Sequence, residues 1–176
     1  MDLVGQIIND LIDDSKPLQQ ALHKTLVLAK RLKNDNLTEW VSNELNGYKN
    51  NLPDYRILHC YVVGGMKTYF EMIDGVPIPL SYLEKGLQEG LQQIRMYENI
   101  AGLERIAAAG PDKLLYYSID LELCGYITQL LQKNGQEVAV VYARQRISSR
   151  AVVSIISVVK TRLLDMMLEL EDELNN

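Results

Sequence analysis

The chain has 176 residues, which is enough for one domain with a sizeable core. Its 47% hydrophobic and 23% charged residues exclude a disordered chain, and its net charge of −5 argues against a protein that coats nucleic acid. The N-terminal residues lack the basic segment and long apolar core of a signal peptide. No apolar run approaches the roughly 20 residues of a membrane span, so we expect a soluble, cytoplasmic protein without a membrane span.

Apolar residues at helical spacing predict three short helices in the first 47 residues. The first covers Leu3–Ile12, and the second follows Ser15, whose hydroxyl is a candidate N-cap. The third opens at Asn36 in a capping-box variant and ends at Gly47, where a left-handed stop is expected. The sequence therefore predicts an N-terminal three-helix layer.

The hydrophobic period changes after residue 52, which predicts strands. Residues 56–63 are rich in Ile, Tyr and Val, and Gly64-Gly65 can supply the positive φ angles of a tight hairpin. Residues 67–73 then form the returning strand, which Asp74-Gly75 closes with a second turn. Two prolines in residues 76–80 remove ladder donors, so this segment is expected at a sheet edge.

The middle of the chain predicts two helices, then an extended piece, and then a compact helix. Ser81 is the candidate cap of a helix that carries Leu83, Leu87, Leu91 and Ile94. Its glycines Gly86 and Gly90 are interpreted as points of close backbone approach, with a mobile segment as the alternative. The later elements are a helix over 99–109, an extended segment over 114–118 with exposed aromatic potential at Tyr116 and Tyr117, and a helix over 121–132.

The C-terminal stretch predicts a strand over 138–143 that runs into a long helix. Arg144-Gln145-Arg146 is expected to end the strand, and Ser148 or Ser149 to cap the helix. The helix has a broad apolar stripe of Val152, Ile155, Ile156, Val159, Leu163, Met166, Met167, Leu170 and Leu174. We predict a single domain over residues 1–176 of class α+β, with a three-helix layer, a small mostly antiparallel sheet and a long C-terminal helix packed centrally.

The residues of this sequence do not form a constellation that dictates a reaction. His23 and His59 have no Cys, Asp or Glu at ligand spacing, and no glycine-rich strand-to-helix loop is followed by lysine. Cys60 and Cys124 lie in apolar surroundings and are expected to be buried thiols, with a disulfide or metal pair as the alternative. We therefore predict no catalytic residues, no metal and no cofactor.

A cationic set lies at the junction of the last strand and helix. Arg144 and Arg146 share one face of the strand, and Arg150 falls in the first turn of the helix, where the helix dipole disfavours a cation. Lys160 and Arg162 follow further along the helix. The favoured interpretation is structural ion pairing with acids of the chain such as Glu39 and Glu44, and the alternative is a phosphate ligand.

Trp40 begins a second candidate surface. Trp40 itself is expected in the core, while Glu44 and Tyr48 follow at one and two turns along the same helix face. Tyr55 and Arg56 come after the turn that follows, so these side chains could form a partner-binding corner. The full set of candidate binding residues is Trp40, Glu44, Tyr48, Tyr55, Arg56, Arg144, Arg146, Arg150 and Arg162.

Several motifs along the chain resemble the AbiTii domain of bacterial abortive-infection systems. The most specific are Glu44-Leu45-Asn46-Gly47-Tyr48 and Leu52-Pro53-Asp54-Tyr55-Arg56. Further matches are Asp14-Ser15, Pro17-Leu18, Leu28-Ala29, Arg31-Leu32, Glu39-Trp40-Val41, Pro77-Ile78-Pro79-Leu80-Ser81, Ser148-Ser149-Arg150, Arg162-Leu163-Leu164-Asp165 and Leu168-Glu169-Leu170-Glu171. The resemblance covers nearly the whole chain and implies a role in defence against phage, but it brings no catalytic residues.

Three hypotheses follow for function. The favoured one is a non-enzymatic interaction or sensor module that binds a defence-system partner protein or itself as a homo-oligomer, through the Trp40–Arg56 corner or the Arg144–Arg150 junction. The second is a toxin that binds or cleaves nucleic acid or nucleotides, with Arg144, Arg146 and Arg150 as phosphate clamps and acids such as Glu44 for chemistry or metal binding. A membrane-perturbing effector is disfavoured, because the long apolar stripe is better explained as core.

Overall fold

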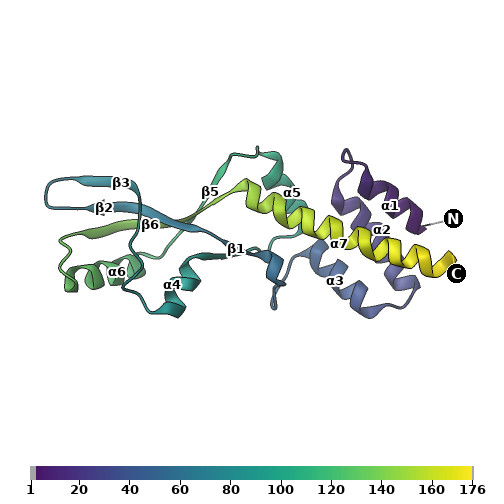
Figure 1. Ribbon diagram of the computed structural model, residues 1–176, viewed down its shortest axis with the longest axis horizontal. Helices are drawn as coiled ribbons and strands as arrows, with labels where there is room; N and C mark the ends of the chain where they lie inside the picture. Colours follow the sequence, from purple (N-terminus) through teal and green to yellow (C-terminus); the bar gives the residue numbers. More distant parts are fainter. Residues whose placement is uncertain (1–2, 176) are drawn as a thin grey trace. The chain divides into compact units, whose positions relative to one another are not determined.

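The structure is a computed structural model that describes residues 3–175, and its fold is α+β (Figure 1). Its contacts divide the chain into two compact units. We call them the helical unit, made of the residues up to 56, 96–112 and those from 149 onward, and the sheet unit, made of 57–95 and 113–148. The single-domain organisation stays a prediction.

The helical unit contains the predicted N-terminal layer and two further helices. Its elements are α1 (Leu3–Ile12), α2 (Leu18–Arg31), α3 (Asp35–Asn46), the 3₁₀ turn η1 (Asp54–Arg56), α5 (Ile100–Ala108) and α7 (Ser149–Asn175). The long helix α7 packs against α1, α5 and η1, which confirms that the C-terminal helix is the central packing partner.

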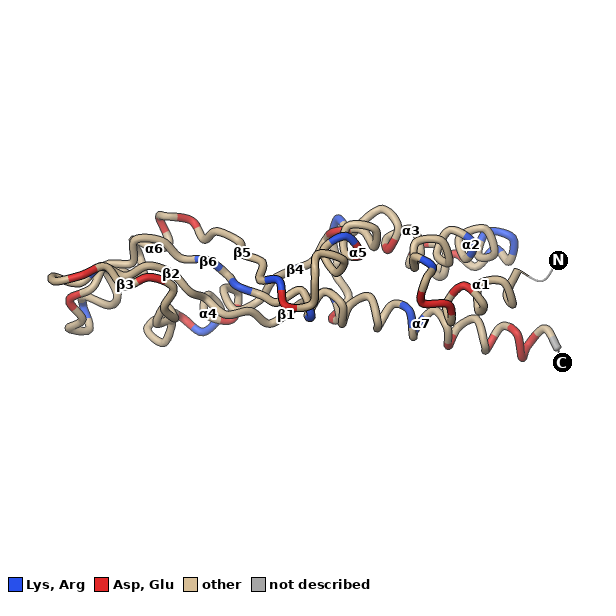
Figure 2. The backbone as a smooth tube through the Cα atoms, turned by 90° about the horizontal axis from the view of Figure 1, so that it is seen from above, with Lys and Arg blue, Asp and Glu red and all other residues tan. Residues whose placement is uncertain are grey.

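The apolar stripe of α7 is buried along most of its length. Val152, Ile155, Val159, Leu163 and Met167 are all at most 1% exposed. Ile156, Met166 and Leu170 are half-buried, and the prediction fails at Leu174, which is exposed near the helix end. Acidic residues dominate this end of α7, as Figure 2 shows in red.

The helix starts differ from the predicted caps. Asn34, not Asn36, caps α3, because its side chain accepts the backbone N–H of Leu37 at 3.0 Å. The N-cap of α2 is Pro17, and Ser15 instead donates its hydroxyl to Asp13. In both cases several polar residues precede the helix, and sequence spacing alone does not select one of them.

An acidic side chain is buried between α1 and α2. The Asp10 carboxylate is 2.6 Å from Lys16 Nζ and 2.5 Å from Lys24 Nζ, and its side chain is 3% exposed. The hydrogen bonds from Lys16 and then Lys24 lower the pKa of Asp10 below its ordinary value, although burial opposes them. The ionised carboxylate therefore stabilises the folded state.

We expect Asp10→Asn to weaken the acid sensitivity of the protein. Because the pKa of Asp10 is lower in the folded than in the unfolded chain, its contribution is complete above the unfolded value near 3.8 and is lost as the pH falls through the folded value. The urea midpoint of the wild type should thus fall below about pH 4 more steeply than that of Asp10→Asn. Parallel pH profiles from pH 2 to 6 would contradict this.

The sheet unit is built on a four-stranded antiparallel sheet. The strands are β2 (Tyr61–Lys67), β3 (Met72–Pro77), β5 (Leu114–Ser118) and β6 (Ala139–Ser148), in the order β3-β2-β6-β5. A short antiparallel pair joins β1 (Ile57–His59) to β4 (Gln93–Arg95), and two helices complete the unit, α4 (Lys85–Leu91) and α6 (Leu121–Lys133). Helix α6 packs on one face of the sheet, with Cys124, Ile127 and Leu131 against Val62, Val140 and Ala143.

The predicted hairpin turn at Gly64-Gly65 is wrong, since both glycines lie inside β2. A Cβ on Gly64 would collide with the Tyr142 carbonyl oxygen and lie 2.9 Å from Ala143 Cα, so this glycine permits close approach of β6. The turn lies between β2 and β3, where the Thr68 hydroxyl accepts the N–H groups of Phe70 and Glu71. The predicted turn at Asp74-Gly75 is likewise inside β3, at the edge of the sheet.

Two further expectations for the sheet unit are corrected. Helix α4 begins at Lys85 after Glu84 rather than at a Ser81 cap, and Ile94 belongs to β4. A Cβ on Gly86 or Gly90 would meet nothing within 4 Å, so these glycines do not mark close backbone packing. The last strand also continues through Arg144 and Arg146 to Ser148.

Cys60 and Cys124 are buried free thiols, as predicted. Burial raises the pKa of both thiols above the ordinary value. Over the described residues 3–175, no helix combines the length and the apolar character needed to cross a membrane.

Candidate functional site

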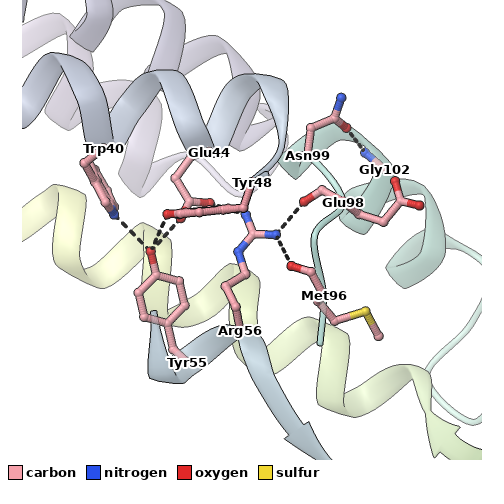
Figure 3. A network of polar contacts seen from close by, with 9 residues as sticks. All are labelled: Trp40, Glu44, Tyr48, Tyr55, Arg56, Met96, Glu98, Asn99 and Gly102. Atoms are coloured by element: carbon pink, nitrogen blue, oxygen red, sulfur yellow. Dashed lines mark hydrogen bonds and ion pairs between the residues drawn. The ribbon is translucent and has the colours of Figure 1, made fainter. Parts of the chain in front are cut away.

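The Trp40 corner forms one network of polar contacts in the helical unit, centred on Glu44 (Figure 3). Tyr48 and Tyr55 donate their hydroxyls to Glu44 Oε1 at 2.7 and 2.5 Å, and the Trp40 indole N–H donates to the Tyr55 hydroxyl at 2.9 Å. The other carboxylate oxygen, Oε2, forms an ion pair with Arg56 Nη2. All five residues predicted for this corner therefore converge.

Arg56 ties the network to the segment before α5. Its Nη1 donates to the carbonyls of Met96 at 3.3 Å and Glu98 at 2.5 Å, and its own carbonyl accepts the Met96 N–H at 2.9 Å. The guanidinium carbon lies 5.1 Å from the centre of the Tyr48 ring, within cation–π range. Arg56 Nε has no hydrogen-bond partner among the described residues. One side chain thus joins η1, α3 and the start of α5.

Gly47 brings α3 into position for these contacts. It ends α3 with φ of +86°, a conformation that a side chain disfavours, and an added Cβ would lie 2.8 Å from the Tyr97 carbonyl oxygen. The next residue, Tyr48, donates its N–H to the same carbonyl at 3.0 Å. The two most specific motifs, Glu-Leu-Asn-Gly-Tyr and Pro-Asp-Tyr-Arg, therefore supply the acceptor, the tight turn, the two hydroxyl donors and the cation of one network.

The two tyrosine hydroxyls stay protonated. Burial, followed by hydrogen bonds with Tyr55 and Glu44, raises the pKa of Tyr48 far above its ordinary value. Burial, followed by the hydrogen bond to Glu44, raises the pKa of Tyr55 in the same direction. Both hydroxyls therefore remain donors to the carboxylate at any ordinary pH.

The centre of the network is internal. The side chains of Glu44 and Arg56 have no exposed surface, so neither can touch a partner or a substrate directly. Glu44 therefore has no access to a metal ion or nucleotide from solution, which removes the basis for the chemistry assigned to it in the toxin hypothesis. What the pair does is fix the relative positions of α3, η1 and the segment before α5.

The accessible part of this corner is a groove between α3 and α7, which we call the helix groove. It has a volume of about 410 Å³ and is lined by the N-cap Asn34 with Asn36, Leu37 and Trp40 from α3, and by Met166, Glu169, Leu170 and Glu173 from α7. Trp40 is half-buried here rather than fully in the core. Its floor is apolar and its rim on α7 is acidic.

The predicted arginines separate into three environments. Arg162 of α7 lies over the Tyr55 ring, 5.3 Å from its centre, and so borders the Glu44 network. Arg150 forms an ion pair with Asp112 at 2.7 Å, which confirms structural pairing but with an acid other than those suggested. Arg144 and Arg146 belong to β6 in the sheet unit, over the rings of Tyr142 and Tyr61 at 4.8 and 6.0 Å.

Sequence reasoning did not identify several residues of these surfaces. Met166 and Leu170 were assigned to the apolar stripe of the last helix and Leu37 was given no role, and no local signal shows that α3 and α7 leave a groove between them. The Met96 and Glu98 contacts use backbone carbonyls, which no side-chain pattern reports. Tyr61 was assigned to a strand, but the face of the sheet on which it lies was not predicted. The exposure expected of Tyr116 and Tyr117 is confirmed.

Within the described part of the chain, no three His, Cys, Asp or Glu side chains are grouped so that they could hold a metal ion. The fold and the site together define a small α+β protein with a buried Glu–Arg network beside an open groove. A family model described as AbiTii matches residues 2–176. The chain therefore belongs to the AbiTii family and is a component of bacterial abortive-infection defence against phage. Neither the search of curated proteins nor that of solved structures found a match.

Proposed function

We propose that the chain serves its abortive-infection system as a non-enzymatic interaction or sensor module, and that a partner protein docks in the helix groove. The observation that carries the proposal is the groove itself, with an apolar floor at Leu37, Trp40, Met166 and Leu170. An apolar floor with a polar rim is the usual anatomy of a protein-binding surface.

The acidic rim of the groove indicates the charge of the partner. Glu169 and Glu173 line the α7 side of the groove and are both exposed. An amphipathic segment with apolar side chains for the floor and Lys or Arg for the rim would complement both features. The Glu44–Arg56 pair supports this role by holding α3 rigidly, because a preformed groove loses less entropy on binding.

The test is a charge reversal on the rim, Glu169→Lys with Glu173→Lys. Lysines near the C-terminus of α7 are favourable to the helix dipole, so the variant should fold as well as the wild type. We expect it to lose phage protection in a plaque assay, and to lose the partner that native mass spectrometry detects in wild-type protein from infected cells.

The matched control reverses two exposed acids of the sheet unit that lie outside its helices, Glu71→Lys with Glu137→Lys, with the same change of net charge. This variant should protect as the wild type does and retain the partner. Full protection by the rim variant, or equal loss in the control, would overturn the proposal. The partner in the groove can also be a second copy of this chain. In that case native mass spectrometry would detect an oligomer of the wild type that the rim variant does not form.

A further inference from the structure

One face of the sheet unit carries cations and aromatic rings that the helix-groove proposal does not use. Helix α6 covers the other face through its contacts with Val62, Val140 and Ala143. Directly paired residues of antiparallel strands point to the same side of a sheet. Arg146 of β6 pairs with Tyr61 of β2 and with Tyr116 of β5, so these three form one row on the side away from α6.

A second row continues the surface. Arg144 lies two residues before Arg146 on β6, and Tyr142 two residues before that. The Tyr142 ring lies over Gly65, whose missing side chain makes room for it, and its hydroxyl donates to Asp74 at the β3 edge. We call Tyr61, Tyr116, Tyr142, Arg144 and Arg146 the open sheet face.

The rings and charges of this face are available. Tyr61 is 65% and Tyr116 49% exposed, although both are large aromatic residues. Among the described residues, Arg144 and Arg146 form no ion pair with an acid, whereas Arg56 and Arg150 each do. The guanidinium planes of Arg144 and Arg146 lie instead over Tyr142 and Tyr61. β6 carries these cations, blue in Figure 2, and no acid.

The charge balance of the sheet unit favours an anionic ligand at this face. Residues 57–95 and 113–148 contain seven Lys and Arg and seven Asp and Glu, so the net charge of −5 belongs entirely to the helical unit. At the open sheet face, Arg144 and Arg146 stand against one acid, Asp74 at the β3 edge, so the balance of charge there is positive. The exposed tyrosine rings beside these arginines favour a ligand that also has planar groups, because planar groups can stack on the rings.

We propose that the open sheet face binds a single-stranded nucleic acid. Bases would stack on Tyr61 and Tyr116, and phosphates would pair with Arg144 and Arg146, which combines the two interactions that single-strand-binding sheets use. A duplex is disfavoured, because its bases are stacked on each other and present no free face. This activity lies beyond the docking proposed for the helix groove and uses different residues in the other unit.

The test measures fluorescence anisotropy of the full chain with a labelled 15-nucleotide oligo(dT), an oligo(U) of the same length and a DNA duplex, at 50 and 200 mM salt. We expect binding to the single strands and weaker binding to the duplex. Arg144→Gln with Arg146→Gln should weaken binding and reduce the slope of log affinity against log salt by about 1.4, or 0.7 for each lost phosphate contact. Tyr61→Leu and Tyr116→Leu should each weaken binding roughly five- to 150-fold while leaving that slope unchanged.

Matched controls come from the helices of the same unit. Lys85→Gln with Lys133→Gln removes two exposed cations, and Tyr126→Leu removes an exposed tyrosine of α6. These variants, and Glu169→Lys with Glu173→Lys in the helical unit, should bind as the wild type does, so the two proposals succeed or fail separately. Circular dichroism confirms that each variant is folded. Three results would overturn the proposal: no binding by the wild type at 100 µM, an equal loss of binding in the controls, or a duplex bound as tightly as a single strand. Absence of binding is also the result expected if a protein occupies this face.

Discussion

Replacing Arg56 by methionine should lower the free energy of unfolding by about 3–5 kcal/mol. The change leaves the Glu44 carboxylate fully buried without its cation and deprives the carbonyls of Met96 and Glu98 of their donor. Trp40 is the sole tryptophan of the sequence and donates a hydrogen bond into this network. Its fluorescence during urea unfolding therefore measures the loss of stability with a probe that lies in the network itself.

The control for this prediction is Arg150→Met, because the Arg150–Asp112 pair has similar chemistry but side chains that are 69% and 78% exposed. Solvent screening limits such a pair to less than about 1 kcal/mol. The double variant Glu44→Gln with Arg56→Met should lose at least about 1 kcal/mol less than the sum of the two single changes, since it removes both buried charges. Additive losses, or an Arg56→Met loss no larger than that of Arg150→Met, would show that the buried pair does not act as a unit.

Gly64→Ala should destabilise the protein by about 3 kcal/mol, near the upper end of the cost of overpacking. The new Cβ would meet the Tyr142 carbonyl oxygen and Ala143 Cα. Both are backbone atoms of the neighbouring strand, so they cannot rotate away as a flexible side chain would. Unfolding in urea followed by far-ultraviolet circular dichroism measures the effect.

Gly90→Ala is the matched change for Gly64→Ala, with the opposite sign expected. Gly90 lies inside α4, and a Cβ there would have nothing within 4 Å. Alanine should therefore raise the free energy of unfolding by about 0.5–1 kcal/mol through helix propensity. A lower free energy of unfolding for Gly90→Ala, or an unchanged one for Gly64→Ala, would contradict the prediction that the close approach of β6 makes glycine necessary at position 64 but not at position 90.

Helices were predictable because their evidence is local. Periodic apolar residues define α1, α2, α5, α6 and α7 to within a few positions. The stripe of α7 is fully buried at five of its nine predicted positions, half-buried at Ile156, Met166 and Leu170, and exposed at Leu174. The glycines show where local evidence fails. Gly64 serves a contact with β6, some 80 residues away in sequence, while a glycine pair in isolation indicates a turn.

The sequence predicted which residues form the candidate site, but not which of them are exposed. Spacing placed Glu44 and Tyr48 on one helix face with Tyr55 and Arg56 nearby. Tyr48 in fact lies beyond the end of α3, after Gly47, but the structure does bring the four side chains together. Burial depends on the segment before α5, which no pattern connects to α3. The same limit applies to the arginines, because a run of cations does not reveal that Arg150 has Asp112 as its partner while Arg144 and Arg146 lie over tyrosine rings.

The division of the helical unit into three separate stretches has a consequence for synthesis on the ribosome. The first 56 residues emerge long before α7, which begins at residue 149 and supplies buried side chains to their core. At ordinary translation rates this interval lasts roughly 5–20 s. The apolar face of α1 that packs on α7 therefore stays uncovered during that time, and the helical unit completes its core only after the sheet unit has been translated.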